Sequence, residues 1–64
     1  MTIVVLRHYP ALIHAELAKS ALAAYDIRAT VRPGSYRGMY ELLVRAEDFE
    51  AATGILGPEE TFRD

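Results

Sequence analysis

The chain has 64 residues, no cysteine, and nine acidic against seven basic residues, which gives a formal net charge of −2. This length predicts one domain with a small core, and the absence of cysteine excludes disulfides and thiolate metal sites. The acidic balance disfavours a nucleic-acid binder, and the only strongly apolar run near the N-terminus is too short for a signal peptide or a membrane span. We therefore expect a soluble cytoplasmic protein, with one domain over residues 1–57 and a polar tail over residues 58–64.

The first two elements are predicted to be a strand and a helix. Thr2–Arg7 is apolar at four consecutive positions, which is typical of a strand buried on both faces. Pro10 suits the first turn of a helix, and the helical pattern runs from Ala11 to Tyr25. Its apolar positions form a central stripe with two flanking residues, and these are Ala11, Ala15, Ala18, Leu22 and Tyr25, flanked by Leu17 and Ala21.

A hairpin and a second helix are predicted to follow. Residues 27–32 alternate apolar and polar, the period of a half-covered strand. Residues 33–38 are rich in turn formers, and Met39–Val44 is predicted to be the next strand. Ala46–Leu56 reads as a helix that buries a stripe of Phe49, Ala52 and Leu56.

The predicted order βαββα indicates an α+β ferredoxin-like sandwich. Right-handed connection of the two parallel strands leaves room between them for the third strand. We expect a three-stranded antiparallel sheet of order 1-3-2 with both helices on one face, and the tail is a candidate for a short fourth strand. The first strand would then lie at an exposed edge, which natural proteins usually cover or pair.

The predicted helix resembles that of the prokaryotic signal-transducing protein family, a group of short bacterial domains of unknown function. The resemblance spans most of residues 3–56 and rests on three groups of residues: Ala15, Glu16, Leu17, Ala18, Lys19, Ser20, Leu22 and Ile27 around the first helix; Glu41 to Val44; and Glu47, Asp48, Ala51 and Ala52. It implies a ferredoxin-like domain similar in shape to nitrogen-regulatory PII-type proteins, with a regulatory role and no catalytic residues.

Two positions depart from that family. Asp26 stands where the family usually places glycine before the isoleucine of the second strand, and an aspartate tolerates a left-handed turn less well than glycine does. Ala11 stands near the position where an asparagine or aspartate cap is common. We expect both departures to affect the ends of the first helix without changing the topology.

No constellation of residues predicts an enzyme, a metal or a cofactor. His8 and His14 are six residues apart, across a loop and a helix start, and do not share a helical face. Ser20 and Ser35 lack an oriented base and acid. The turn over residues 33–38 has two glycines, but it lacks the lysine of a phosphate loop and leads into a strand.

The turn and the open face of the sheet carry the candidate binding residues. Tyr36 and Arg37 can stack and donate hydrogen bonds at the tip of the hairpin, although a solvated tip is the favoured interpretation of these residues. Residues 37–40 match the basic, glycine and aromatic signature of an RNA-recognition motif only weakly. That signature places aromatic residues on the open sheet face, where Glu41 and Leu43 are expected instead, and the predicted first strand carries no aromatic residue.

An apolar centre with an arginine rim is predicted on the sheet face away from the helices. Val4 or Leu6, together with Leu43, is expected there, and a one-residue change of register would exchange the two faces of the first strand. Its polar neighbours are expected to be Arg28, Thr30 and Arg32. Such a surface is typical of an interface, although ordinary surface hydrophobes are the alternative.

Two functions are consistent with these features. The first is a non-enzymatic regulatory or protein-interaction module that self-associates, with a dimer favoured, and binds an unknown protein or small molecule. The second is a binder of an anion, a nucleotide or RNA. Its binding residues would be Arg28, Arg32, Tyr36 and Arg37.

Overall fold

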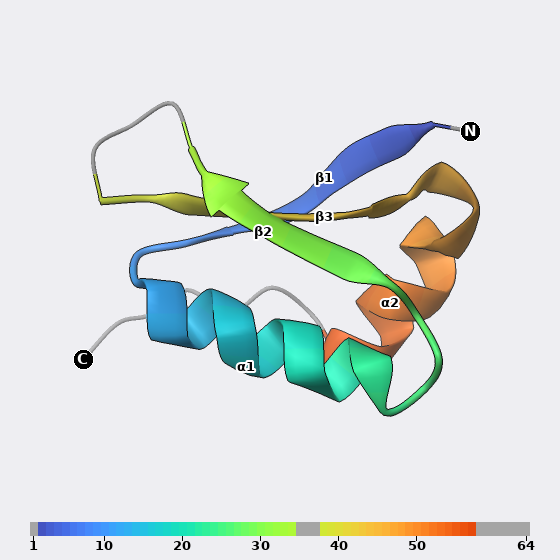
Figure 1. Cartoon of the computed structure of the whole chain (residues 1–64). Helices are drawn as coiled ribbons and strands as arrows, with labels where there is room; N and C mark the ends of the chain where they lie inside the picture. Colours follow the sequence, from blue (N-terminus) through green and yellow to red (C-terminus); the bar gives the residue numbers. More distant parts are fainter. Residues whose placement is uncertain (1, 35–37, 58–64) are drawn as a thin grey trace.

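The structure, a computed structural model, describes residues 2–34 and 38–57. The elements in chain order are β1 (Ile3–Tyr9), α1 (Leu12–Ala23), β2 (Ala29–Pro33), β3 (Tyr40–Arg45), the 3₁₀ turn η1 (Ala46–Asp48) and α2 (Phe49–Leu56). The sheet has the order β1-β3-β2, and β3 is antiparallel to both neighbours. Both helices lie on the same side of the sheet (Figure 1).

This arrangement confirms the predicted ferredoxin-like βαββα fold. The tail over residues 58–64, named above as a candidate fourth strand, lies outside the described residues. Among the described helices, none combines the length and apolar character needed to cross a membrane.

The core lies between the sheet and the helices. Leu42 and Val44 on β3 are almost fully buried, and from α1 the buried residue Leu22 packs in the same cluster. Two alanines of α1, Ala15 and Ala18, are also buried, so the predicted alanine stripe is confirmed. Small side chains let the helix backbone lie close to the sheet.

Four residues predicted to belong to the apolar stripes are exposed, and these are Leu17, Ala21, Tyr25 and Phe49. Leu17 is 63% exposed and Tyr25 is 65% exposed. Tyr25 lies beyond Ala23, the last residue of α1, and Leu17 lies on the flank of a buried stripe that proves narrower than predicted. Phe49 has the correct helical phase but is the first residue of α2 and stays 40% exposed.

A β-bulge decides which side chains of β1 face the helices. The register between β1 and β3 shifts between Val5 and Arg7, which leaves Leu6 as the extra residue. Val4 and Leu6 both pack against the core. The prediction that one of them lies on the open face is therefore wrong, and the positions there belong to Ile3 and Val5.

The bulge also places Arg7 on the helix side, opposite Leu42. Its guanidinium donates a hydrogen bond to the carbonyl of Gly57, which caps the C-terminus of α2. The bulge and this hydrogen bond together connect the first strand to the last helix.

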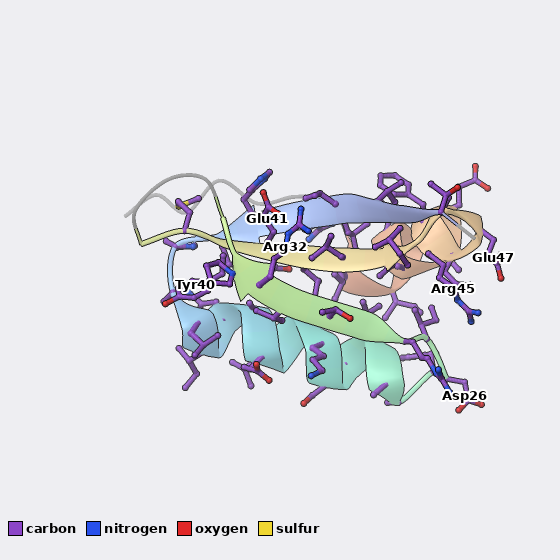
Figure 2. The ribbon with its side chains drawn as sticks, turned by 45° about the horizontal axis from the view of Figure 1, so that its top comes forward. Asp26, Arg32, Tyr40, Glu41, Arg45 and Glu47 are labelled. Atoms are coloured by element: carbon purple, nitrogen blue, oxygen red, sulfur yellow. The ribbon has the colours of Figure 1, made fainter. Side chains whose placement is uncertain are left out.

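The turn from α1 into β2 has the hydrogen bonds of a Schellman motif. The N–H of Ile27 donates to the carbonyl of Leu22 at 3.0 Å, and the N–H of Asp26 donates to that of Ala23 at 3.0 Å. Asp26 has a φ of +65° at this left-handed position (Figure 2). Ile27 and Leu22 are both buried, which supplies the apolar contact that usually accompanies this motif.

Candidate functional site: the uncovered sheet face and its edges

No described element covers the sheet face opposite the helices. Side chains alternate along each strand, so the burial of Leu42 and Val44 against the helices places Glu41, Leu43 and Arg45 on the other face. Cross-strand partners share a face, which adds residues from both outer strands. These are Ile3, Val5 and His8 from β1, and Thr30 and Arg32 from β2.

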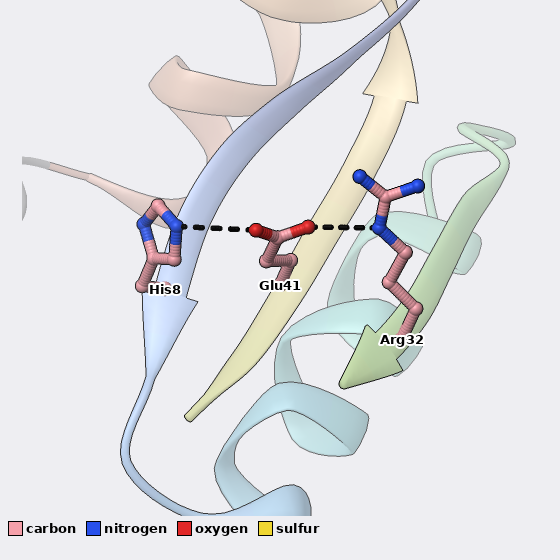
Figure 3. Close-up of polar contacts among 3 residues, drawn as sticks. All are labelled: His8, Arg32 and Glu41. Carbon is pink, nitrogen blue, oxygen red and sulfur yellow. Dashed lines mark hydrogen bonds and ion pairs between the residues drawn. The ribbon is translucent and has the colours of Figure 1, made fainter. Parts of the chain in front are cut away.

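A charged row crosses all three strands at one end of this face. Glu41 on β3 lies between His8 on β1 and Arg32 on β2 (Figure 3). The Nε of Arg32 donates to Oε1 of Glu41 at 2.8 Å, and Nε2 of His8 lies 3.6 Å from Oε2. Each carboxylate oxygen therefore has a partner on a different strand.

Glu41 is only 9% exposed, and its carboxylate forms ion pairs with both neighbours in this row. The hydrogen bond from Arg32 lowers the pKa of Glu41, and the charges of Arg32 and His8 act in the same direction, while partial burial opposes them. The carboxylate is therefore ionised at neutral pH. In return it neutralises Arg32, whose side chain is otherwise 59% exposed.

The other half of the face has a depression of about 190 Å³ with both apolar and polar lining residues. Leu43 lines this depression and is only 6% exposed, because Val5 and Thr30 flank it on the neighbouring strands. Ile3 is 52% exposed at the margin. Arg28 and Arg45 also line the depression.

Arg45 lies within ion-pair distance of Glu47 and Asp48. Its Nε lies 3.6 Å from Oδ2 of Asp48, and Nη1 lies 4.0 Å from Oε2 of Glu47 (Figure 2). Arg28, by contrast, makes no ion pair with any described residue. It is exposed, and it lines a second depression of about 420 Å³ beside β2.

This second depression lies between α1 and the start of β2. Its lining contains Lys19 and Ala23 from the helix and Ala29 and Thr30 from the strand, with no described residue from β3 or α2. It therefore opens on the side of β2 that faces away from β3.

Among the described residues the sheet has two free edges, because β1 and β2 each pair only with β3. The N–H of Gly34 donates to the carbonyl of Met39 at 2.9 Å, so these two residues form a hydrogen-bonded pair. Along an antiparallel ladder, hydrogen-bonded pairs alternate with pairs whose backbone groups point away from each other. By this alternation the backbone groups of Ala29, Val31 and Pro33 point away from β3. The edge of β2 is therefore a row of backbone groups that pair with no described residue.

The predicted binding residues fall into separate groups. Arg28 and Leu43 line the same depression, whereas Arg32 belongs to the charged row with Glu41. Tyr36 and Arg37 lie outside the described residues. Arg28 and Arg32 therefore do not converge on one described site.

The pairing of Glu41 was missed at the sequence level. Glu41 was predicted on the open face, but its partners depend on the hairpin register, and the long turn left that register undefined. A hairpin closed symmetrically around residues 36 and 37 would have placed Arg32 opposite Glu41.

The two histidines lie on different elements. His8 pairs with Glu41 on the sheet, whereas His14 is on α1 and exposed. Within residues 2–34 and 38–57 no three histidine, aspartate or glutamate side chains are grouped closely enough to hold a metal ion.

Comparison with known proteins found no matching family model, no matching curated protein and no matching solved structure. The resemblance to the prokaryotic signal-transducing protein family therefore stays a prediction, and function has to be argued from the geometry.

Proposed function

We propose that the protein is a small non-enzymatic interaction module that works as a homo-oligomer, with its sheet as the interface. The observation that carries this proposal is a three-stranded sheet whose described residues place helices on one face only and leave the outer edges of β1 and β2 unpaired.

The small core of a chain of this length favours self-association. A chain of this size buries only about 60% of the surface that its unfolded form exposes, and small domains commonly gain stability from a second subunit. The protein has no cysteine for a disulfide. A second copy would cover apolar surface and pair backbone groups that otherwise face water.

We further propose a regulatory role, in which the assembled module binds a protein or a small molecule. The support for this role is the resemblance stated above together with the sheet-face depression around Leu43, which has Arg28 and Arg45 on its margin. An apolar centre with an arginine margin is a composition enriched in protein interfaces.

The test is the molar mass in solution, measured by light scattering and sedimentation from micromolar to millimolar concentration. We expect a mass above that of one chain. The helix variants Ile13→Asp and Leu17→Asp are matched controls, because both side chains are exposed and apolar but lie on α1, away from the sheet. A monomer at every concentration contradicts a sheet interface, and so does a loss of assembly in either helix variant.

The anion-binding alternative keeps one observation in its favour. Lys19 and Arg28 both line the 420 Å³ depression, although Asp26 lies there too. Against it, the ion pair with Glu41 already neutralises Arg32. Titration with ATP and with a short single-stranded RNA at low salt decides between the two functions: binding that weakens with salt and with Arg28→Ala supports the alternative.

A further inference from the structure

We propose that a second copy of this chain pairs with the free edge of β2, antiparallel and with a two-fold axis at Val31. Two three-stranded sheets would then join into one continuous six-stranded sheet. This inference rests on the self-association proposed above and specifies its interface.

The two edges differ in their capacity to pair. The ladder of β1 is interrupted by the bulge at Leu6, and a bulge near the edge is one of the devices that prevent edge-to-edge pairing. The register of β2 with β3 is regular from Ala29 to Pro33. The uninterrupted edge of β2 is therefore the better template for a second strand.

The backbone of β2 fits its own two-fold copy. The outward-facing residues are Ala29, Val31 and Pro33, as derived above. With the axis at Val31, the Val31 residues of the two copies exchange both hydrogen bonds, as directly opposed residues do in an antiparallel pair. The N–H of Ala29 then meets the carbonyl of Pro33, and the missing N–H of Pro33 costs one bond at each end of the ladder.

The ion pair of Arg32 removes an obstacle to this pairing. Charged side chains on an edge strand normally oppose the approach of a second edge. Arg32 would lie opposite Thr30 of the second copy, with the two Arg32 residues on a diagonal. Because Glu41 neutralises each Arg32 within its own chain, that diagonal carries little net repulsion.

Helix α1 presents a complementary row of side chains on the same side as this edge. Lys19 and Ala23 line the depression beside β2. Residues three, four and seven positions apart share a helical face, so Leu12 and Glu16 belong to the same row. Lys19, Leu12 and Glu16 are all exposed in the single chain.

The position of the axis brings opposite charges together. Ala23 lies level with the start of β2, because both line one depression. Val31 is two strand residues beyond Ala29, about 7 Å, and that length corresponds to four or five residues of helix. The axis therefore passes near Ala18, between Glu16 and Lys19. Glu16 of each copy would face Lys19 of the other, and Leu12 would face Ala23.

A charge-exchange series tests this arrangement in the full chain. The variants Glu16→Lys and Lys19→Glu each place like charges across the axis, and we expect each to weaken dimerisation about tenfold. The double variant Glu16→Lys/Lys19→Glu restores opposite charges, and we expect it to dimerise nearly as well as the parent chain. All three keep strong helix-forming residues at exposed positions, so the fold should persist, as circular dichroism can verify.

Amide hydrogen exchange identifies the edge independently. At concentrations where the protein is dimeric, we expect slower exchange at the N–H groups of Ala29 and Val31 than in the monomer. The N–H of Val5, on the free edge of β1, is the internal control and should exchange equally fast in both states.

The outcomes separate this inference from the proposed function. A dimer that responds to the single charge variants, recovers in the double variant and protects Val31 supports the β2 interface. A dimer that ignores the charge series, or that protects Val5 and leaves Val31 unprotected, overturns the inference and leaves a self-associating module. A monomer at all concentrations overturns both.

Discussion

Replacing Asp26 with glycine should stabilise the protein, because Asp26 occupies the one non-glycine position with positive φ among the described residues. The backbone there is fixed by the Schellman hydrogen bonds of Asp26 and Ile27 to the last turn of α1. The left-handed conformation costs a residue with a Cβ about 1–2 kcal/mol of conformational free energy, and the cost is smaller for aspartate, which tolerates this region.

Two further effects set the size of the gain. Glycine loses more backbone entropy on folding than other residues, which subtracts about 0.5–1 kcal/mol. The Asp26 carboxylate also stands at the negative end of the α1 dipole, an unfavourable placement worth about 0.3–1 kcal/mol at low salt. The net expectation for Asp26→Gly is a gain of about 0.5–1 kcal/mol, or a rise in Tm of about 2–8 °C for a domain of this size.

The assay is urea unfolding followed by circular dichroism, with Asp26→Asn as the matched control. Asparagine keeps the tolerance for positive φ but removes the charge, so the stability it gains measures the dipole effect alone, and that part should fade in high salt. If Asp26→Gly is no more stable than Asp26→Asn, the strain at this turn does not exceed the entropic cost of glycine and the reasoning is refuted.

Two more predictions concern the first helix and the sheet. Ala11 is the N-cap of α1, with extended φ and ψ and no side-chain cap hydrogen bond; Ala11→Ser should add about 1 kcal/mol to the free energy of unfolding, and its effect should add to that of Asp26→Gly because the two sites lie at opposite ends of the helix. An unchanged urea midpoint for Ala11→Ser would show that the end of the helix is already satisfied. The pKa of Glu41 is lowered in the folded chain, so its ion pairs stabilise the fold above the unfolded pKa, near 4.5, and this contribution is lost as pH falls through the lowered folded pKa. Unfolding measured from pH 6 to pH 2 should therefore show a smaller loss of stability in Glu41→Gln than in the parent chain, and parallel curves would contradict a paired Glu41.

Local patterns predicted the elements and their order because each pattern has one dominant physical cause. The alternation over residues 27–32 and the alanine-rich period around Ala15, Ala18 and Leu22 each match a single secondary structure. Strand order then followed from the handedness of the connection between β1 and β2.

The details of the site depended on relations between strands that local patterns do not contain. Val4 and Val5 are chemically equivalent, so the sequence offers no signal for which of them faces the helices. The pairing of Glu41 with Arg32 likewise depends on the register of a hairpin whose turn could close in several ways. Both features depend on the register between neighbouring strands, which the pattern of a single strand does not contain.

The bulge at Leu6 has two effects. It decides which side chains of β1 face the helices, and it makes the edge of β1 less regular than the edge of β2. Without the extra residue, Leu6 would stay on the helix side and Arg7 would lie on the open face. From there Arg7 could not reach the carbonyl of Gly57 at the end of α2. The bulge keeps both residues on the helix side and at the same time breaks the outer edge of β1. One inserted residue therefore secures α2 against the sheet and blunts one edge, which leaves β2 as the regular edge at which a second strand can be added.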